Sequence, residues 1–168
     1  MKSMNWFDRK LTFGLSPEML PFYLERLEGT ILRLEHKIKN VDDKILSHRF
    51  NDKWSVKQHI GHLAEVDEVG NKRIGEMISG MQILSKAVFE PKGYNPWPIE
   101  KVVEFLRKTR TENINRYKSL SLNDLIKASM HPRLNVPMTP VDLAWFDAEH
   151  DDHHLVKLTE IITENVHC

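Results

Sequence analysis

Cysteine, net charge and long apolar runs are all scarce in this chain of 168 residues. Its one cysteine, Cys168, is the last residue, so it cannot form an intrachain disulfide or a cysteine-cluster metal site, and a reducing, cytoplasmic location fits best. The 24 basic residues balance the 24 acidic ones, which disfavours long-range attraction to nucleic acid or to an anionic membrane. The start, MKSMNWFDRK, lacks the apolar core of a signal peptide, and no apolar run is long enough to span a membrane.

The length and composition are those of one globular domain. Hydrophobic residues make up 40% of the chain and charged residues 29%, so the chain can bury a sizeable core. Alternation of the kind that predicts β-strands is scarce, and no internal repeat is evident. We therefore expect a single domain over residues 1–168.

Four amphipathic patterns predict four long helices. Thr139 before Pro140 places a capping hydroxyl ahead of a proline, and Ser55 with Gln58 matches a capping box. Apolar residues then recur at helical spacing after each start. The predicted helices cover residues 17–39, about 55–80, roughly 98–119 and roughly 140–165.

The segments between these helices decide how a bundle is connected. Val41 to Lys53 is polar and is expected to be a loop, and Ser121 can open a short helix before a proline-containing stretch. The links 40–54 and 119–139 are long enough to cross a bundle. The predicted fold class is all-α, a four-helix bundle with long crossing connections.

The last helix carries three histidines between His150 and His154. His150 and His154 are four residues apart, so they lie about 40° apart around the helix axis. Leu143 and Ile161 lie in the same sector, which places both imidazoles in the apolar stripe that faces the core. A divalent ion would satisfy both rings at once. In the alternative interpretation they bond to water, to carboxylates or to each other and shape the core.

A third ligand should come from another helix, and the helix at 55–80 supplies two candidates. Its periodicity places His59 deeper and His62 at the rim, and does not choose between them. Glu65 and Asp67 could orient ligands, although a solvated helix face is the commoner position for such carboxylates. Asp147 could orient an imidazole or accept a proton, with a surface carboxylate as the more usual role.

Other catalytic patterns have little support. His150-Asp151-Asp152-His153-His154 is close to the H-E-x-x-H peptidase motif, but Asp151 replaces the glutamate and no clear downstream ligand follows. The sequence holds no glycine-rich phosphate loop and no G-x-S-x-G elbow.

Three tryptophans are candidates for positions beside a site. Trp54 and Trp97 could wall a substrate entrance, although packing at loop corners is the more usual role. Trp145 points away from the core stripe, so it could belong to a subunit interface.

Two segments together resemble the DinB-like superfamily, in particular its YfiT-like metal-binding branch. The first runs from Trp54 to Leu63, WSVKQHIGHL, and the second from Glu149 to His154, EHDDHH. The resemblance spans nearly the whole chain in order. It implies a bundle with up-down-down-up connectivity, often dimeric, in which three histidines bind zinc, nickel or a similar divalent ion.

By motif position, the resemblance implies that His62 rather than His59 is the ligand from the second predicted helix, together with His150 and His154. His153 matches no ligand position, and we expect it to be an edge residue. The roles of His59 and Asp147 stay open.

Members of this superfamily with known activity transfer low-molecular-weight thiols, such as bacillithiol or glutathione, to electrophiles, or isomerise maleylpyruvate with mycothiol; others are described as metal-dependent hydrolases. The resemblance therefore implies a thiol S-transferase-like enzyme that acts on a small electrophile. The alternatives are hydrolysis by metal-bound water and a non-catalytic, metal-binding dimeric module. The balanced charge gives nucleic-acid binding little support.

Overall fold

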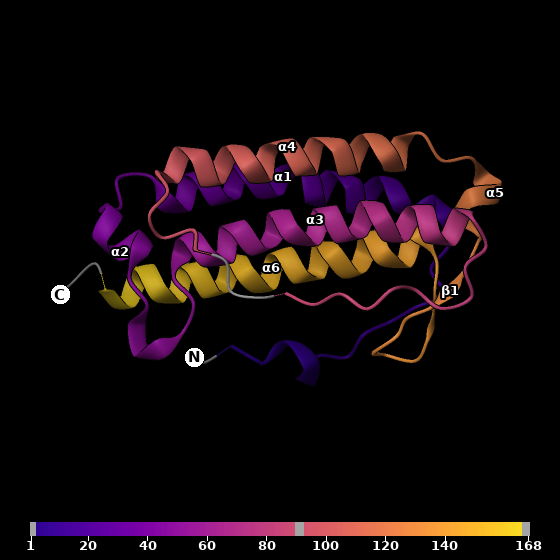
Figure 1. Cartoon of the computed structure of the whole chain (residues 1–168), viewed down its shortest axis with the longest axis horizontal. Helices are drawn as coiled ribbons and strands as arrows, with labels where there is room; N and C mark the ends of the chain where they lie inside the picture. The colour runs from indigo at the N-terminus through magenta and orange to yellow at the C-terminus, as the bar shows by residue number, and fades with distance from the viewer. Residues whose placement is uncertain (1–2, 90–92, 166–168) are drawn as a thin grey trace.

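The computed structural model describes residues 3–89 and 93–165, and four long helices run side by side through it (Figure 1). They are α1 (Leu20–Ile38), α3 (Val56–Ile78), α4 (Ile99–Lys118) and α6 (Pro140–Asn165). α1 contacts α4 and α6, and α3 contacts the same two helices, so α1 and α3 lie diagonally opposite. This arrangement confirms the predicted all-α four-helix bundle.

Figure 1 shows that α3 and α4 run in the same direction, while α1 and α6 run in the opposite one. Two consecutive parallel helices need a connection that returns along the bundle, and residues 79–89 and 93–98 belong to that connection. The links 40–54 and 119–139, although long enough to cross the bundle, each stay at one end of it (Figure 1).

The links contain more regular structure than the sequence indicated. Between α1 and α3 lie α2 (Asp43–Ser47) and a short 3-10 helix (Phe50–Asp52), where a loop was expected. α5 (Leu122–Leu125) begins at Ser121, as predicted, and is followed by β1 (Ser129–Met130), which pairs antiparallel with β2 (Pro137–Met138). Two further 3-10 helices, Trp6–Asp8 and Pro17–Met19, precede α1.

The helix starts follow the local chemistry of the sequence. The Ser55 hydroxyl accepts from the backbone N–H of Gln58, whose side chain accepts from the backbone N–H of Ser55, and this capping box fixes the start of α3. Thr139 and Asp142 exchange hydrogen bonds in the same way at the start of α6. α3 ends at Ile78 before Gly80, whose φ of +79° suits a residue without a side chain. Met81, just beyond that end, is 44% exposed.

The core consists of two apolar clusters along the bundle axis. One cluster includes Leu27, Met77 and Tyr117, and the other includes Leu34, Ile60 and Leu106. The residues between them along the helices are polar and buried, with Asp67 from α3 and Arg110 from α4 among them. The middle of the bundle is therefore a polar layer.

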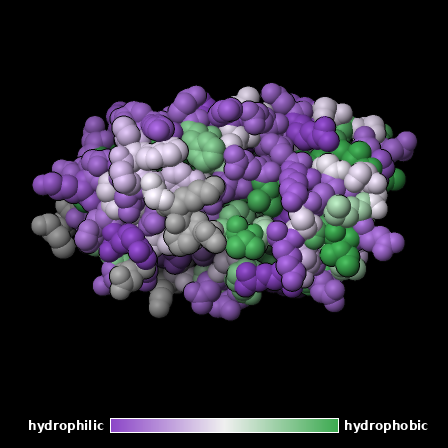
Figure 2. Space-filling model, viewed as in Figure 1, coloured by the Kyte–Doolittle hydropathy of each residue, from purple (hydrophilic) through white to green (hydrophobic). Residues whose placement is uncertain are grey.

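The surface is mainly hydrophilic on the face shown in Figure 2, with apolar side chains gathered in the middle and at one end. Among the helices of the described residues, none combines the length and the apolar composition that a membrane span requires.

Candidate metal centre

Three imidazole rings from two helices meet at one side of the bundle. One ligand atom each from His62 on α3 and from His150 and His154 on α6 lie within 4.8 Å of one another. The ring centroids of His150 and His154 are 4.4 Å apart, and that of His62 is 5.3 Å and 5.0 Å from them. His150 and His154, which spacing placed together, and His62, which the resemblance implied, thus converge across the α3–α6 interface.

The nitrogens of these rings are only partly satisfied by hydrogen bonds. His154 Nε2 lies 3.1 Å from His150 Nε2. His62 Nδ1 and His150 Nδ1 are buried without a hydrogen-bond partner. The Nε2 atoms of His150 and His154 face each other, and a group of convergent imidazoles suits a divalent ion of the zinc or nickel type. The residues present therefore fit the ion that the resemblance implies.

Burial keeps these rings neutral at pH 7. It lowers the pKa of His62 to about 4. It also holds the pKa values of His150 and His154 well below their usual range, and repulsion from the neighbouring histidines lowers these two pKa values further. A neutral imidazole has a free lone pair, whereas a protonated one cannot bind a metal. The three rings are therefore in the form that a ligand requires.

His59 is as buried as His62 and contacts the cluster from one side. Its Nδ1 lies 2.7 Å from Nδ1 of His154. The two α3 histidines are 8% and 7% exposed, so the expectation that His59 lies deep and His62 at the rim was wrong. Burial lowers the pKa of His59 to about 3. His153 is half-buried and touches the ring of His154, as expected of an edge residue.

Aromatic rings from the N-terminal segment and from two links between helices lie against the cluster. The Trp54 ring lies 4.8 Å from that of His62, and the Phe89 ring lies 4.6 Å from it. The Trp6 ring lies 5.0 Å from that of His150. Trp54 therefore lies in the wall of the site, as considered from the sequence, whereas Trp6 and Phe89 were not anticipated.

Trp6 reaches the site because the N-terminal segment packs along α6. Arg9 lies over the Trp6 ring at 5.3 Å and donates to the carbonyl oxygen of Glu149 at 3.0 Å. Farther along, the ring of Phe13 lies 6.0 Å from that of Trp145. The N-terminal segment thus covers Trp145, which is half-buried against the chain's own core.

Behind the histidines, the polar layer contains a buried ion-pair network. Arg110 Nε donates to Asp67 at 2.9 Å, and Arg110 Nη1 donates to Asp151 at 2.5 Å and to the carbonyl of Leu27 at 2.8 Å. Thr30 on α1 donates to Asp151 at 2.6 Å, so the network joins all four long helices. Burial raises the pKa of Asp67 to about 7, although Arg110 opposes the shift.

The surface position expected for three carboxylates was wrong. Asp67, Glu65 and Asp147 are 0%, 6% and 4% exposed. Glu65 accepts a hydrogen bond from the hydroxyl of Tyr94 at 2.6 Å, and burial raises the pKa of Asp147 well above its usual range. The periodicity of one helix does not reveal partners on another, such as Arg110 for Asp67, and these partners allow carboxylates to be buried.

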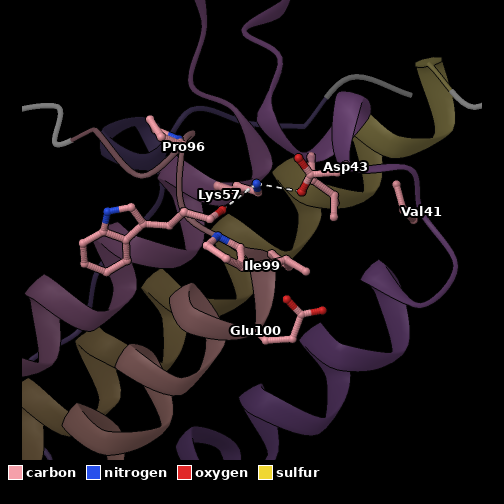
Figure 3. Close-up of a pocket in the computed structure, with 9 residues that line it drawn as sticks. Val41, Asp43, Lys57, Pro96, Ile99 and Glu100 are labelled. Carbon is pink, nitrogen blue, oxygen red and sulfur yellow. Dashed lines mark hydrogen bonds and ion pairs between the residues drawn. The ribbon is translucent and has the colours of Figure 1, made fainter.

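A hollow apart from the histidines lies where α2 meets the start of α4 (Figure 3). It has a volume of about 520 Å³, and Lys57 reaches it with a side chain that is 2% exposed. Its ammonium group contacts Asp43 at 2.7 Å, the carbonyl of Trp97 at 2.7 Å and that of Asn95 at 3.3 Å. All three N–H bonds of Lys57 thus have acceptors, and the residue ties two links to α3. Trp97 packs at this corner, apart from the histidines.

Comparison with known proteins agrees with this geometry. The sequence model of the DinB superfamily matches residues 26–156. YfiT from Bacillus subtilis, described as a probable metal-dependent hydrolase with an unusual four-helix bundle topology, has a similar structure, with a TM-score of 0.78 and 18% identity over 91% of each chain.

The mycothiol-dependent maleylpyruvate isomerase is also similar, with a TM-score of 0.65 and 10% identity. The match covers 93% of this chain and 63% of the isomerase. No curated protein matches the sequence. Since the family model spans most of the chain, from α1 through α6, this protein belongs to the DinB superfamily.

Proposed function

We propose that His62, His150 and His154 bind a divalent ion, zinc or nickel, and that the protein transfers a low-molecular-weight thiol to a small electrophile. The observation that carries this proposal is the convergence of three imidazoles with one ligand atom each within 4.8 Å. Three protein ligands leave a position for a reactant, which distinguishes a catalytic site of the zinc type from a closed structural one.

The ion supplies one kind of chemistry, since a bound divalent metal lowers the pKa of a coordinated thiol or water. The chain's own residues hold the ion and shape its surroundings. Trp6, Trp54 and Phe89 place apolar rings around the histidines, which limits the access of water and suits a soft, weakly hydrated sulfur.

A thiol suits this site better than water because it needs less activation. A free thiol has a pKa of about 8.5, against about 15.7 for water. Within residues 3–89 and 93–165, no carboxylate forms a hydrogen bond with the rings of His62, His150 or His154. The thiol dependence of the maleylpyruvate isomerase supports the same choice.

Hydrolysis is the second candidate, and the similarity to YfiT favours it. The same three histidines would hold the ion, and water would take the position of the thiol. The two activities differ in their need for a cosubstrate. Assays of the metal-loaded protein with thiols and electrophiles, beside assays with esters and amides, separate them. Stoichiometric metal without turnover in either assay would instead support a non-catalytic binding module.

The first test of the proposal is metal retention. We expect about one divalent ion per chain in the purified protein, measured by elemental analysis, and none in the double variant His150→Ala/His154→Ala. His153→Ala is the matched control, because it removes a neighbouring histidine that lies outside the cluster of three. Full metal retention in the double variant would exclude the site.

We also propose that the protein is a homodimer. Phe22, Leu122 and Ile126 are 65%, 73% and 64% exposed, and burying such apolar side chains at a subunit contact would be favourable. Light scattering after size exclusion measures the mass directly, and a monomer at micromolar concentration would contradict the proposal.

A further inference from the structure

His59 contacts the histidine cluster at a position that a ligand's supporting group would occupy. It lies on α3, one turn before His62, and its Nδ1 is 2.7 Å from Nδ1 of His154. The other nitrogen of His154, Nε2, is directed toward the cluster, 3.1 Å from Nε2 of His150. His59 therefore meets His154 on the side of the ring that faces away from the other ligands.

This contact constrains where the proton of His154 resides. A neutral imidazole has one N–H and one lone pair, on different nitrogens. For Nε2 of His154 to offer its lone pair to an ion, the proton must be on Nδ1, which then donates to Nδ1 of His59. Metal-binding histidines generally donate their second ring N–H to a carboxylate, a backbone carbonyl or water, and Nδ1 of His59 takes the place of that acceptor here.

From this geometry we infer that His59 is a positioning residue, which fixes the tautomer and the orientation of His154 through an Nδ1–H···Nδ1 hydrogen bond. The inference rests on the proposed function, because it assigns His59 a role toward the ion that His154 holds. His150 lacks this support: its Nε2 faces His154, and its Nδ1 has no hydrogen-bond partner. Of the two α6 ligands, His154 is therefore the one that a hydrogen bond at its Nδ1 orients.

His59 is not placed to be a fourth ligand. The two nitrogens of an imidazole point in divergent directions, and His59 lies against the nitrogen of His154 that does not face His150. The group of convergent ligand atoms accordingly contains His62, His150 and His154. The open position that a reactant needs remains available.

Two variants of His59 separate the hydrogen bond from the bulk of the side chain. In His59→Asn, the amide Oδ1 takes approximately the place of Nδ1 and can accept from His154. In His59→Leu, the acceptor is lost. His153→Leu is the matched control, since His153 is adjacent in sequence and touches His154 without a hydrogen bond. Circular dichroism checks that each variant is folded.

The measurement is the dissociation constant for Zn²⁺, by competition with a chelator. We expect His59→Leu to bind about 10- to 100-fold more weakly, and His59→Asn and His153→Leu to stay within about threefold of the wild type. Unchanged affinity in His59→Leu would overturn the inference. The visible spectrum of the Co²⁺-loaded protein should be the same in wild type and His59→Leu; a change in coordination would identify His59 as a ligand and also overturn it.

The metal-free protein provides a readout that is independent of the ion. Nitrogen NMR of the imidazoles should show the proton of His154 on Nδ1, and a proton on Nε2 would contradict the inference. A wild-type protein that binds no divalent ion would overturn the proposed function and, with it, this role of His59. If the wild type binds Zn²⁺ and His59→Leu binds it equally tightly, the role of His59 is overturned while the proposed metal site stands.

Discussion

Removing the charge of Arg110 should destabilise the bundle more than any surface substitution. Its side chain is 3% exposed and lies between Asp67 and Asp151, each 1% exposed. In Arg110→Met, an unbranched apolar side chain replaces the alkyl stem of the arginine and leaves two buried carboxylates without their cation. Loss of one partner from a buried ion pair costs about 3–5 kcal/mol, a large part of the 5–15 kcal/mol that typically stabilises a domain.

The control is Arg107→Met, one turn earlier on α4. Arg107 pairs with Glu35 at the surface, and its side chain is 44% exposed, so we expect a loss of less than about 1 kcal/mol. A triple variant, Arg110→Met with Asp67→Asn and Asp151→Asn, removes the charges together and should recover at least half of the lost stability.

Urea unfolding followed by circular dichroism measures the free energy of unfolding of each variant. A value for Arg110→Met within about 1 kcal/mol of the wild type would show that the network does not hold the four helices together. A triple variant no more stable than Arg110→Met would show that unpaired charge is not the cause of the loss.

Three further predictions concern other parts of the chain. Gly61→Ala should lower the free energy of unfolding by about 1–3 kcal/mol, because the added Cβ would lie 2.3 Å from the Tyr94 ring. Gly75→Ala, whose Cβ would meet open space, should raise it by up to about 1 kcal/mol. The opposite ranking in urea unfolding would contradict this prediction. Burial lowers the pKa of His131 to about 4, so the unfolded chain binds its proton first and stability falls as the pH drops below about 6.5. In His131→Asn, the amide oxygen can accept from the same two backbone N–H groups, those of Arg133 and Leu134. Between pH 7 and pH 5, the free energy of unfolding of this variant should fall by about 1 kcal/mol less than that of the wild type. Equal decreases would show that His131 does not cause the pH dependence. Ni²⁺ should quench tryptophan fluorescence, and less so in Trp54→Phe, because Trp54 lies against the histidines.

The four long helices could be predicted from the sequence because their signals are local. Capping residues such as Ser55 and Thr139 satisfy backbone groups within the first turn, and apolar residues repeat within each helix. The connectivity was harder to predict, because nothing in the local sequence of 79–98 shows that this link runs back along the bundle.

The ligand set was only partly predictable from the residues themselves. Spacing placed His150 and His154 together, since both lie on α6. The choice between His59 and His62 depends on how α3 faces α6, which periodicity does not reveal, and the resemblance to a known family supplied it. Both residues proved to be buried, and each contacts His154 in a different way.

The polar layer and the aromatic rings beside the histidines could not be predicted from the pattern of any single helix. Asp67 is buried because Arg110, 43 residues later, neutralises it across the bundle. Trp6 belongs to a segment without a clear periodic pattern, and it reaches His150 because Arg9 fastens that segment to α6. The signals that could have indicated both were an arginine on a helix face with apolar neighbours and a tryptophan in the N-terminal stretch before the first predicted helix.

A crystal structure of the zinc- or nickel-loaded protein, with anomalous diffraction recorded at the metal's absorption edge, tests the proposed metal centre most directly. We expect one ion bonded to nitrogens of His62, His150 and His154 at about 2.0–2.1 Å, with at least one position free of protein ligands. No ion between these rings, or an ion whose remaining position is closed by His59 or another side chain, would contradict it.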